Sequence, residues 1–260
     1  MIAPESDHIV ASTEGGVRTL VINRPEKKNA ITLAMYGRLV DELGLAAEDP
    51  AIRVVVITGV DGVFTAGNDL ADFQNPSDEE TTPGVFPFLA VLPLFPKPLL
   101  AGVNGLAVGI GTTMLLHCDL VFASSEAVFS MPFARLGLTP EAGSSLLFPN
   151  VAGLQRATEL LMLGEPFDAG RAREVGLVNE VIAPDQLGQR VAQRAEELAA
   201  LPPAAVRQTK ALIRHDLINQ LKEVLEREGE VFRERLGSPE AAEAFAAFFE
   251  KRAADFSRFD

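Results

Sequence analysis

The sequence predicts an α/β core over residues 1–200 and a helical region over residues 201–260. Short apolar runs rich in β-branched residues, which are typical of buried strands, recur in the first part of the chain. A helical pattern separates the first two of these runs. After Leu177–Ile182 the strand patterns stop, and Pro202-Pro203 precedes three helical patterns. Because strands that alternate with helices favour parallel pairing with helical crossovers, we expect an α/β fold with much parallel sheet.

The elements follow from local patterns. Leu33–Ala47 has apolar residues along one face, and Thr32 before it is an N-cap candidate. The acidic, proline-containing segment Asp72–Gly84 is the expected flexible loop. The expected strands of the core are Val17–Ile22, Val54–Thr58, Leu99–Val103 and Asp119–Ala123. The expected C-terminal helices are Ala204–His215, Leu217–Leu236 and Pro239–Phe256.

Composition excludes several classes of protein. With 47% apolar and 23% charged residues in 260, the chain has the balance of an ordinary globular protein. A net charge of −13 disfavours binding to nucleic acid or to an anionic membrane, both of which attract positively charged surfaces. The single cysteine, Cys118, excludes an internal disulfide and suits a reducing cytoplasm, and the start Met1–His8 lacks a secretion signal. We therefore expect a cytoplasmic protein.

One uncharged segment, Pro98–Cys118, has the length of a membrane span. Four glycines and Asn104 in its middle disfavour a membrane helix and favour a buried strand, a tight turn and a helix. The three histidines are scattered and have no metal-ligand spacing with Cys118, so we expect no metal site.

Two glycine turns follow buried strands, Phe64–Leu70 and Asn104–Gly111. Glycine allows close backbone approach, and unpaired N–H groups at a helix start stabilise negative charge on a ligand. Each turn alone is more often a simple tight turn. The second turn does not match the dinucleotide-binding fingerprint, because Met114 stands where that fingerprint requires glycine.

The segment Leu138–Gly143 has two interpretations. In the structural one, Thr139 caps a helix, Pro140 takes its first position, and Glu141 complements the helix dipole. In the functional one, Glu141 is a general base in a water-poor cleft. The residues of this segment alone leave both open.

Taken together and in order, these segments resemble the crotonase family, the enoyl-CoA hydratase/isomerase superfamily. The resemblance is carried by Asn23-Arg24-Pro25 through Asn29-Ala30, Phe64 to Leu70, Asn104 to Gly111, Cys118-Asp119, Gly176-Leu177-Val178, Leu201-Pro202-Pro203 and Glu250-Lys251-Arg252. It implies a ClpP/crotonase spiral of ββα units with a C-terminal helical region, assembled as homotrimers or dimers of trimers. It also implies an acyl-CoA thioester as substrate, so that coenzyme A is part of the substrate and no separate cofactor is expected.

The resemblance further implies roles for individual residues. The thioester oxygen would accept hydrogen bonds from the backbone N–H groups of Asn68 and Ile110, although the family usually has glycine at the second position. The expected substrate-binding residues are Lys27, Lys28, Ala30, Ala66, Gly67, Asp69, Leu70, Gly109, Phe133 and Leu138.

The reaction depends on which carboxylates are present. Hydratases of the family carry two glutamates, at positions where this chain has Thr113 and Phe133. Pro140-Glu141 followed by Ser144-Ser145 is instead similar to the Δ3,Δ2-enoyl-CoA isomerase branch, in which one glutamate moves a proton from C2 to C4. That similarity implies a role in fatty-acid metabolism.

Two alternatives stay open. The first is an enoyl-CoA hydratase or another crotonase-type reaction with Asp69 as a second group. The second is a catalytically silent acyl-CoA-binding protein.

Overall fold

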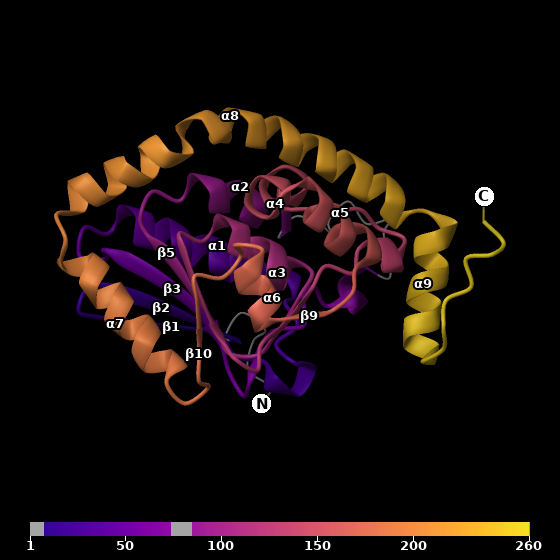
Figure 1. The fold of residues 1–260 in the computed structure, drawn as a ribbon, viewed down its shortest axis with the longest axis horizontal. Helices are drawn as coiled ribbons and strands as arrows, with labels where there is room; N and C mark the ends of the chain where they lie inside the picture. Colours follow the sequence, from indigo (N-terminus) through magenta and orange to yellow (C-terminus); the bar gives the residue numbers. More distant parts are fainter. Residues whose placement is uncertain (1–7, 74–84, 260) are drawn as a thin grey trace.

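Two β-sheets form the centre of the molecule in a computed structural model, which describes residues 8–73 and 85–259 (Figure 1). In the six-stranded sheet the order is β1-β2-β3-β5-β7-β10, and in the four-stranded sheet it is β4-β6-β8-β9. The large sheet consists of β1 (Ile9–Glu14), β2 (Val17–Ile22), β3 (Val54–Gly59), β5 (Leu99–Val103), β7 (Leu120–Ser124) and β10 (Glu180–Ile182). The small sheet consists of β4 (Val63–Thr65), β6 (Leu106–Val108), β8 (Val128–Ser130) and β9 (Phe167–Asp168). Neighbouring strands are parallel, except in the β1–β2 and β8–β9 pairs.

The two sheets are built by one repeated step along the chain. A strand of the large sheet is followed directly by a strand of the small sheet, in the pairs β3–β4, β5–β6 and β7–β8. The β3–β4 turn and the β5–β6 turn are in close contact, since a Cβ at Gly105 would lie only 1.6 Å from the carbonyl oxygen of Gly62. The predicted α/β fold with much parallel sheet and a helical C-terminal region is confirmed. The four predicted core strands are present, whereas β1 and the short strands of the small sheet were not predicted.

The helices surround the sheets (Figure 1). Their bounds are α1 (Leu33–Glu48), α2 (Val85–Val91), α3 (Ile110–Thr113), α4 (Ser144–Ala152), α5 (Leu154–Leu163), α6 (Ala169–Glu174), α7 (Leu187–Ala200), α8 (Pro203–Leu236) and α9 (Pro239–Glu250). Short 3-10 turns are η2 (Pro25–Lys27), η3 (Leu70–Phe73), η4 (Leu92–Leu94), η5 (Met114–His117) and η6 (Ala134–Leu136). Thr32 is the N-cap of α1, since its hydroxyl accepts a hydrogen bond from the Met35 N–H at 3.3 Å. At the other end of α1 the buried ammonium of Lys97 donates to the carbonyls of Ala46 and Asp49.

The C-terminal helices differ from the prediction in their bounds. Two expected helices are one 34-residue helix, α8, which crosses the whole molecule (Figure 1). The Asp119 carboxylate on the core accepts from Lys210 at 2.7 Å and from Arg214 at 2.8 Å, which fastens the first half of α8. No helix among the described residues is long and apolar enough to cross a membrane. Pro98–Cys118 contains β5, β6, α3 and η5.

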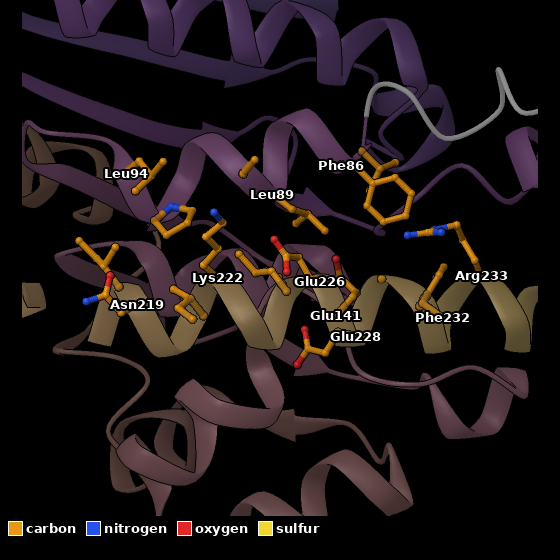
Figure 2. A pocket seen from close by; sticks show the side chains of 18 of the residues that line it. Phe86, Leu89, Leu94, Glu141, Asn219, Lys222, Glu226, Glu228, Phe232 and Arg233 are labelled. Carbon is orange, nitrogen blue, oxygen red and sulfur yellow. The ribbon is translucent and has the colours of Figure 1, made fainter. Parts of the chain in front are cut away.

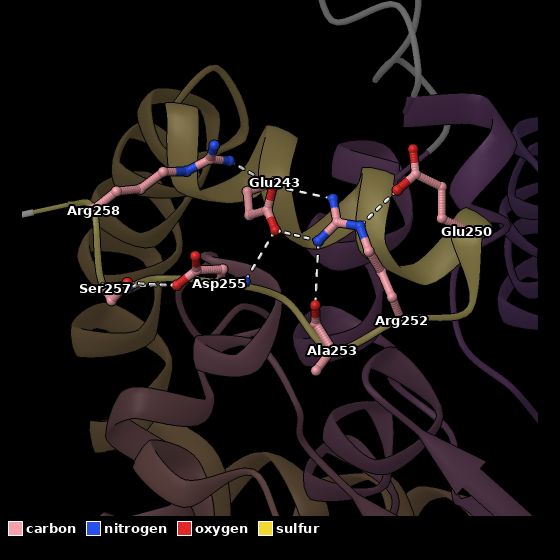
Figure 3. A network of polar contacts seen from close by, with 7 residues as sticks. All are labelled: Glu243, Glu250, Arg252, Ala253, Asp255, Ser257 and Arg258. Carbon is pink, nitrogen blue, oxygen red and sulfur yellow. Dashed lines mark hydrogen bonds and ion pairs between the residues drawn. The ribbon is translucent and has the colours of Figure 1, made fainter.

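Helix α9 ends at Glu250, six residues earlier than predicted, and Lys251 has a φ of 55°. The chain then turns back along α9, as Figure 3 shows. Glu243 on α9 accepts hydrogen bonds from Arg252, from Arg258 and from the Asp255 N–H, and these contacts hold the returning segment. Of the expected flexible loop, residues 72–73 belong to η3, and residues 74–84 lie outside the described residues.

Candidate active site

The two glycine turns lie directly against each other. Strand β4 pairs with β6 in parallel, so the turns that follow or contain these strands are brought to the same side of the small sheet. Gly67 has a φ of +91°, and a Cβ there would lie 2.7 Å from the Val108 carbonyl oxygen. A Cβ at Gly111 would lie 2.5 Å from a methyl group of Thr65. Glycine is therefore favoured at Gly67 by a close backbone and a positive φ, and at Gly111 by the packed Thr65 side chain.

Each turn has one backbone N–H group, that of Asn68 or of Ile110, for which no acceptor is found among the described residues. Ile31 bonds to both neighbours of Asn68, donating to the Gly67 carbonyl at 2.8 Å and accepting from the Asp69 N–H at 2.9 Å. The Asn68 N–H therefore faces away from Ile31. Ile110 is the first residue of α3, so its N–H has no acceptor within that helix. Among the described residues neither N–H donates to a protein acceptor, so both are available to an oxygen of a ligand.

A cavity of about 770 Å³ opens in front of these turns. It is lined by both N–H-bearing residues and by all ten predicted substrate-binding residues, namely Lys27, Lys28, Ala30, Ala66, Gly67, Asp69, Leu70, Gly109, Phe133 and Leu138. Ile110 is 1% exposed and its side chain packs in the core. The side chain therefore does not block a ligand that binds to the Ile110 backbone N–H. Phe232 of α8 and three phenylalanines of α9 complete the wall, which was not predicted.

A second cavity of about 450 Å³ lies between α2 and α8 (Figure 2). Asn68 and Phe232 line both cavities, so the two cavities are neighbours at these residues. Most of the lining is apolar and includes Leu89 on α2 and Leu225 on α8. This cavity was not predicted from the sequence. Its two walls, α2 and α8, are more than 100 residues apart in the chain, and the sequence pattern of each indicates only an amphipathic helix.

Glu141 is a buried carboxyl group in the wall of the second cavity. Its side chain is 5% exposed, and its Oε1 accepts a hydrogen bond from the Thr113 hydroxyl at 2.6 Å. Its Oε2 has no hydrogen-bond partner among the described residues. Burial raises the pKa of Glu141 to about 8; the Thr113 hydrogen bond opposes this rise, and the charge of Glu228 adds to it. A carboxyl with one free oxygen and a pKa this high is suited to take up and release a proton.

The conformation of the loop that carries Glu141 contradicts the helix-capping interpretation of Leu138–Gly143. Thr139 caps no helix, because α4 begins at Ser144 with Gly143 as its N-cap. The buried Thr139 hydroxyl has no hydrogen-bond partner within the described chain. Ala142 and Gly143 have φ values of +59° and +68°, so the chain reverses between Glu141 and the helix. The helix-capping interpretation of Thr139-Pro140-Glu141 is therefore wrong.

Asp69 has a different environment. Its carboxylate accepts from the Arg24 guanidinium at 2.7 Å and from the Ala71 N–H at 3.1 Å. Burial acts to raise the pKa of Asp69, but these hydrogen bonds and the Arg24 charge lower it below the usual range. A carboxylate held in the ionised form is a poor proton donor, which argues against Asp69 as a second catalytic group. The described residues contain no cluster of three or more His, Cys, Asp or Glu that could hold a metal ion.

Comparison with known proteins identifies the family. The model of a family described as enoyl-CoA hydratase/isomerase matches residues 12–258. The chain belongs to the enoyl-CoA hydratase/isomerase family. This family assignment confirms the resemblance to crotonases.

Relatives within the family have several different names. "Enoyl-CoA delta isomerase 2" of Rattus norvegicus is 38% identical over 96% of this chain. This chain spans 65% of that protein's length. "1,2-epoxyphenylacetyl-CoA isomerase" of Escherichia coli K12 is 34% identical over 96% of this chain and 98% of its own length. A solved enoyl-CoA hydratase/isomerase from Pseudoalteromonas atlantica T6c is 44% identical, with a TM-score of 0.92 over 96% of this chain and 99% of that one.

Proposed function

We propose that this enoyl-CoA hydratase/isomerase family member is a Δ3,Δ2-enoyl-CoA isomerase. The observation that carries the proposal is Glu141, a buried carboxyl group whose Oε2 has no hydrogen-bond partner among the described residues and which lines a cavity that Asn68 of the first glycine turn also lines. Names of relatives that contain the words "delta isomerase" support the same reaction.

The substrate would lie across both cavities. The coenzyme A part would occupy the larger cavity, where the exposed ammonium groups of Lys27 and Lys28 supply positive charge for phosphates in an otherwise acidic protein. The thioester oxygen would accept from the N–H groups of Asn68 and Ile110, and the acyl chain would continue past Glu141 between α2 and α8. This arrangement would place the carbon atoms next to the thioester carbonyl beside the base.

The reaction then needs one proton and one base. Glu141 removes a proton from C2, and the C–H electron pair moves into the thioester to form an enolate whose oxygen the two N–H groups stabilise. The protonated Glu141 returns the proton to C4, and the double bond moves from C3–C4 to C2–C3. No water enters the reaction.

Hydration would require a carboxylate that activates water, and the two hydratase positions offer none. Thr113 is a hydroxyl that donates to Glu141, and Phe133 is a buried apolar ring on the wall of the larger cavity. The pattern of groups around the substrate therefore favours isomerisation over hydration.

The test is a paired assay of the purified protein and Glu141→Gln. One arm follows conversion of a 3-enoyl-CoA to the 2-enoyl isomer, and the other follows hydration of crotonyl-CoA. We expect isomerisation that falls at least about 1000-fold in Glu141→Gln, within the range for loss of a general base, with hydration slow in both proteins. Fast hydration by the wild type, or full isomerase activity in Glu141→Gln, would refute the proposal. Binding of acyl-CoA in a calorimeter without either reaction would favour a silent binding protein.

We also propose that the protein assembles as a trimer or a dimer of trimers. Phe248 and Phe249 at the end of α9 are 58% and 47% exposed, and rings of this size at a surface favour contact with another subunit. Light scattering coupled to gel filtration measures the mass directly. A monomer at micromolar concentration would contradict this proposal.

A further inference from the structure

Glu228 is a carboxylate in the middle of an apolar helix face. On α8 it follows Leu221 and Val224 and precedes Phe232, all of which are buried against the core. Its own side chain is 7% exposed. Because taking a carboxylate out of water is costly, an apolar residue at this position would attach α8 to the core more favourably. Packing of α8 therefore does not explain why a carboxylate is here.

The partners of this carboxylate are two backbone N–H groups of the loop that carries Glu141. Glu228 Oε2 accepts from the Gly143 N–H at 2.6 Å, and Oε1 accepts from the Ser145 N–H at 2.9 Å. Gly143 is the N-cap of α4 and has no side chain to cap its own helix. Glu228 supplies that capping group from α8, 83 residues further along the chain from Ser145.

The loop needs such a restraint. Ala142 has a left-handed φ of +59°, a conformation that is unfavourable for a residue other than glycine. The Ala142 carbonyl accepts a hydrogen bond from His117 Nε2 at 2.7 Å. Burial lowers the pKa of His117 to about 4, so the ring is neutral and its Nε2 carries the hydrogen that it donates to the carbonyl. His117 and Glu228 hold the loop on either side of the reversal that orients Glu141.

We propose that Glu228 is a positioning residue for Glu141: its carboxylate fixes the loop at residues 143 and 145 and places a negative charge beside the base. The proposal deepens the isomerase mechanism and rests on it for the role of Glu141. In Figure 2, Glu141 is seen near the part of α8 that carries Glu228.

Glu228 is the buried carboxyl group in the surroundings of Glu141. Burial raises the pKa of Glu228, and the hydrogen bonds from Ser145 and Gly143 oppose that rise and favour the charged form. Among the described residues, the other ionisable groups that line the cavity or contact the loop are His117 on η5 and Lys222, Glu226 and Arg233 on α8. Tyr36 on α1 is close enough for the charge of Glu141 to raise the pKa of its phenol. Tyr36 and His117 are neutral at pH 7, because burial raises the pKa of the phenol and lowers that of the imidazole. The three α8 side chains are exposed, so water screens their charges. Loss of the Glu228 charge should therefore make Glu141 a weaker base.

The experiment compares three variants with the wild type. Glu228→Gln keeps the shape, removes the charge and retains an acceptor for only one of the two N–H groups. Glu228→Asp keeps the charge on a shorter side chain. Glu230→Gln removes an equal charge from an exposed position of the same helix and serves as the matched control.

The first readout is the titration of the Glu141 carboxyl by ¹³C NMR in protein without substrate, with the signal assigned through Glu141→Gln. We expect the midpoint to fall by ~0.5–1 pH unit in Glu228→Gln and to stay in place in Glu228→Asp and Glu230→Gln. The second readout is isomerisation of a 3-enoyl-CoA. We expect kcat to fall ~10–100-fold in both Glu228 variants, because the base is displaced, and KM to change less.

A midpoint unchanged in Glu228→Gln, or a kcat in either Glu228 variant equal to that of Glu230→Gln, would overturn the proposal. If Glu228→Gln does not fold, the kcat of Glu228→Asp decides. A wild type that does not isomerise 3-enoyl-CoA would refute the proposed function, whereas the NMR titration would still test the link between the two carboxyl groups.

Discussion

Ionisation of the buried Glu141 carboxyl should lower the free energy of unfolding as the pH rises, and Glu141→Gln should abolish this pH-dependent loss of stability. Its pKa in the folded chain is about 8, against 4.5 for the ordinary side chain, because the group is buried. Between these values the folded state retains a proton that the unfolded state has lost. The unfolding free energy therefore falls as the pH rises through this window, and the loss is complete above about pH 8.

The size of the effect follows from the same two pKa values. Each pH unit between them costs ~1.4 kcal/mol, so the full window of ~3.5 units corresponds to ~4–5 kcal/mol. Glutamine has nearly the same shape, stays neutral and can accept the Thr113 hydrogen bond. Between pH 5.5 and pH 8.5 we therefore expect the stability advantage of Glu141→Gln over the wild type to grow by ~3 kcal/mol.

Urea unfolding followed by far-UV circular dichroism measures this advantage, since the chain contains no tryptophan for fluorescence. Both pH values avoid the isoelectric point near 4.8, and a fixed protein concentration keeps any contribution of assembly constant. Titrations of groups that do not interact with Glu141 cancel between the two proteins. An advantage that is the same at both pH values, within ~0.5 kcal/mol, would show that Glu141 titrates normally and would refute the water-poor site.

Three further substitutions test the site and its supports. Thr113→Val removes the hydrogen bond that lowers the pKa of Glu141, so the acidic limb of the kcat/KM profile for isomerisation should move up by ~0.5–1 pH unit; an unmoved limb would contradict this. Gly67→Ala requires an unfavourable φ of +91° and a contact of 2.7 Å with a backbone carbonyl, so kcat/KM should fall ~100-fold in the same assay, and a loss below threefold would argue against the role of this turn. Asp119→Asn leaves the two cations of α8 without their carboxylate and should lower the unfolding free energy in urea by ~2–4 kcal/mol; a loss below 1 kcal/mol would mean that other contacts hold α8.

The sequence predicted best those helices and strands that are long enough to show a periodic pattern of apolar residues. The strand Leu99–Val103 and the helix after Thr32 begin and end within one or two residues of their predicted bounds, because short buried apolar runs and N-caps are local signals. The strands of the small sheet have two or three residues each and no detectable period. Helix α8 was predicted as two pieces, although no glycine or proline lies near Asp216 to end it. The end of α9 depends on Glu243 and arginines up to 15 residues away, a contact that no local pattern predicts.

The candidate site was predictable where it consists of backbone and glycine. The two glycine turns could be located from their sequence because close backbone approach leaves few other choices of residue. The walls contributed by α2 and α8 could not be found in this way. Their apolar residues satisfy an amphipathic helix equally well whether they face a core or a cavity. Glu228 was missed for the same reason, since a glutamate in a helix rich in charged residues gives no sign that it is buried.

Asp69 and Glu141 show why residue type alone leaves the chemistry open. Both are carboxyl groups near the glycine turns, and each was a possible catalytic group. The structure gives Asp69 a guanidinium and a backbone N–H, which hold it ionised. It gives Glu141 a single hydroxyl, a free oxygen and a buried carboxylate for a neighbour, which together favour the protonated form. These environments shift the two carboxyl pKa values in opposite directions, which distinguishes a structural ion pair at Asp69 from a proton carrier at Glu141. The residues responsible, Arg24 and Glu228, lie far from their partners in the sequence, so residue type and local pattern could not reveal the difference.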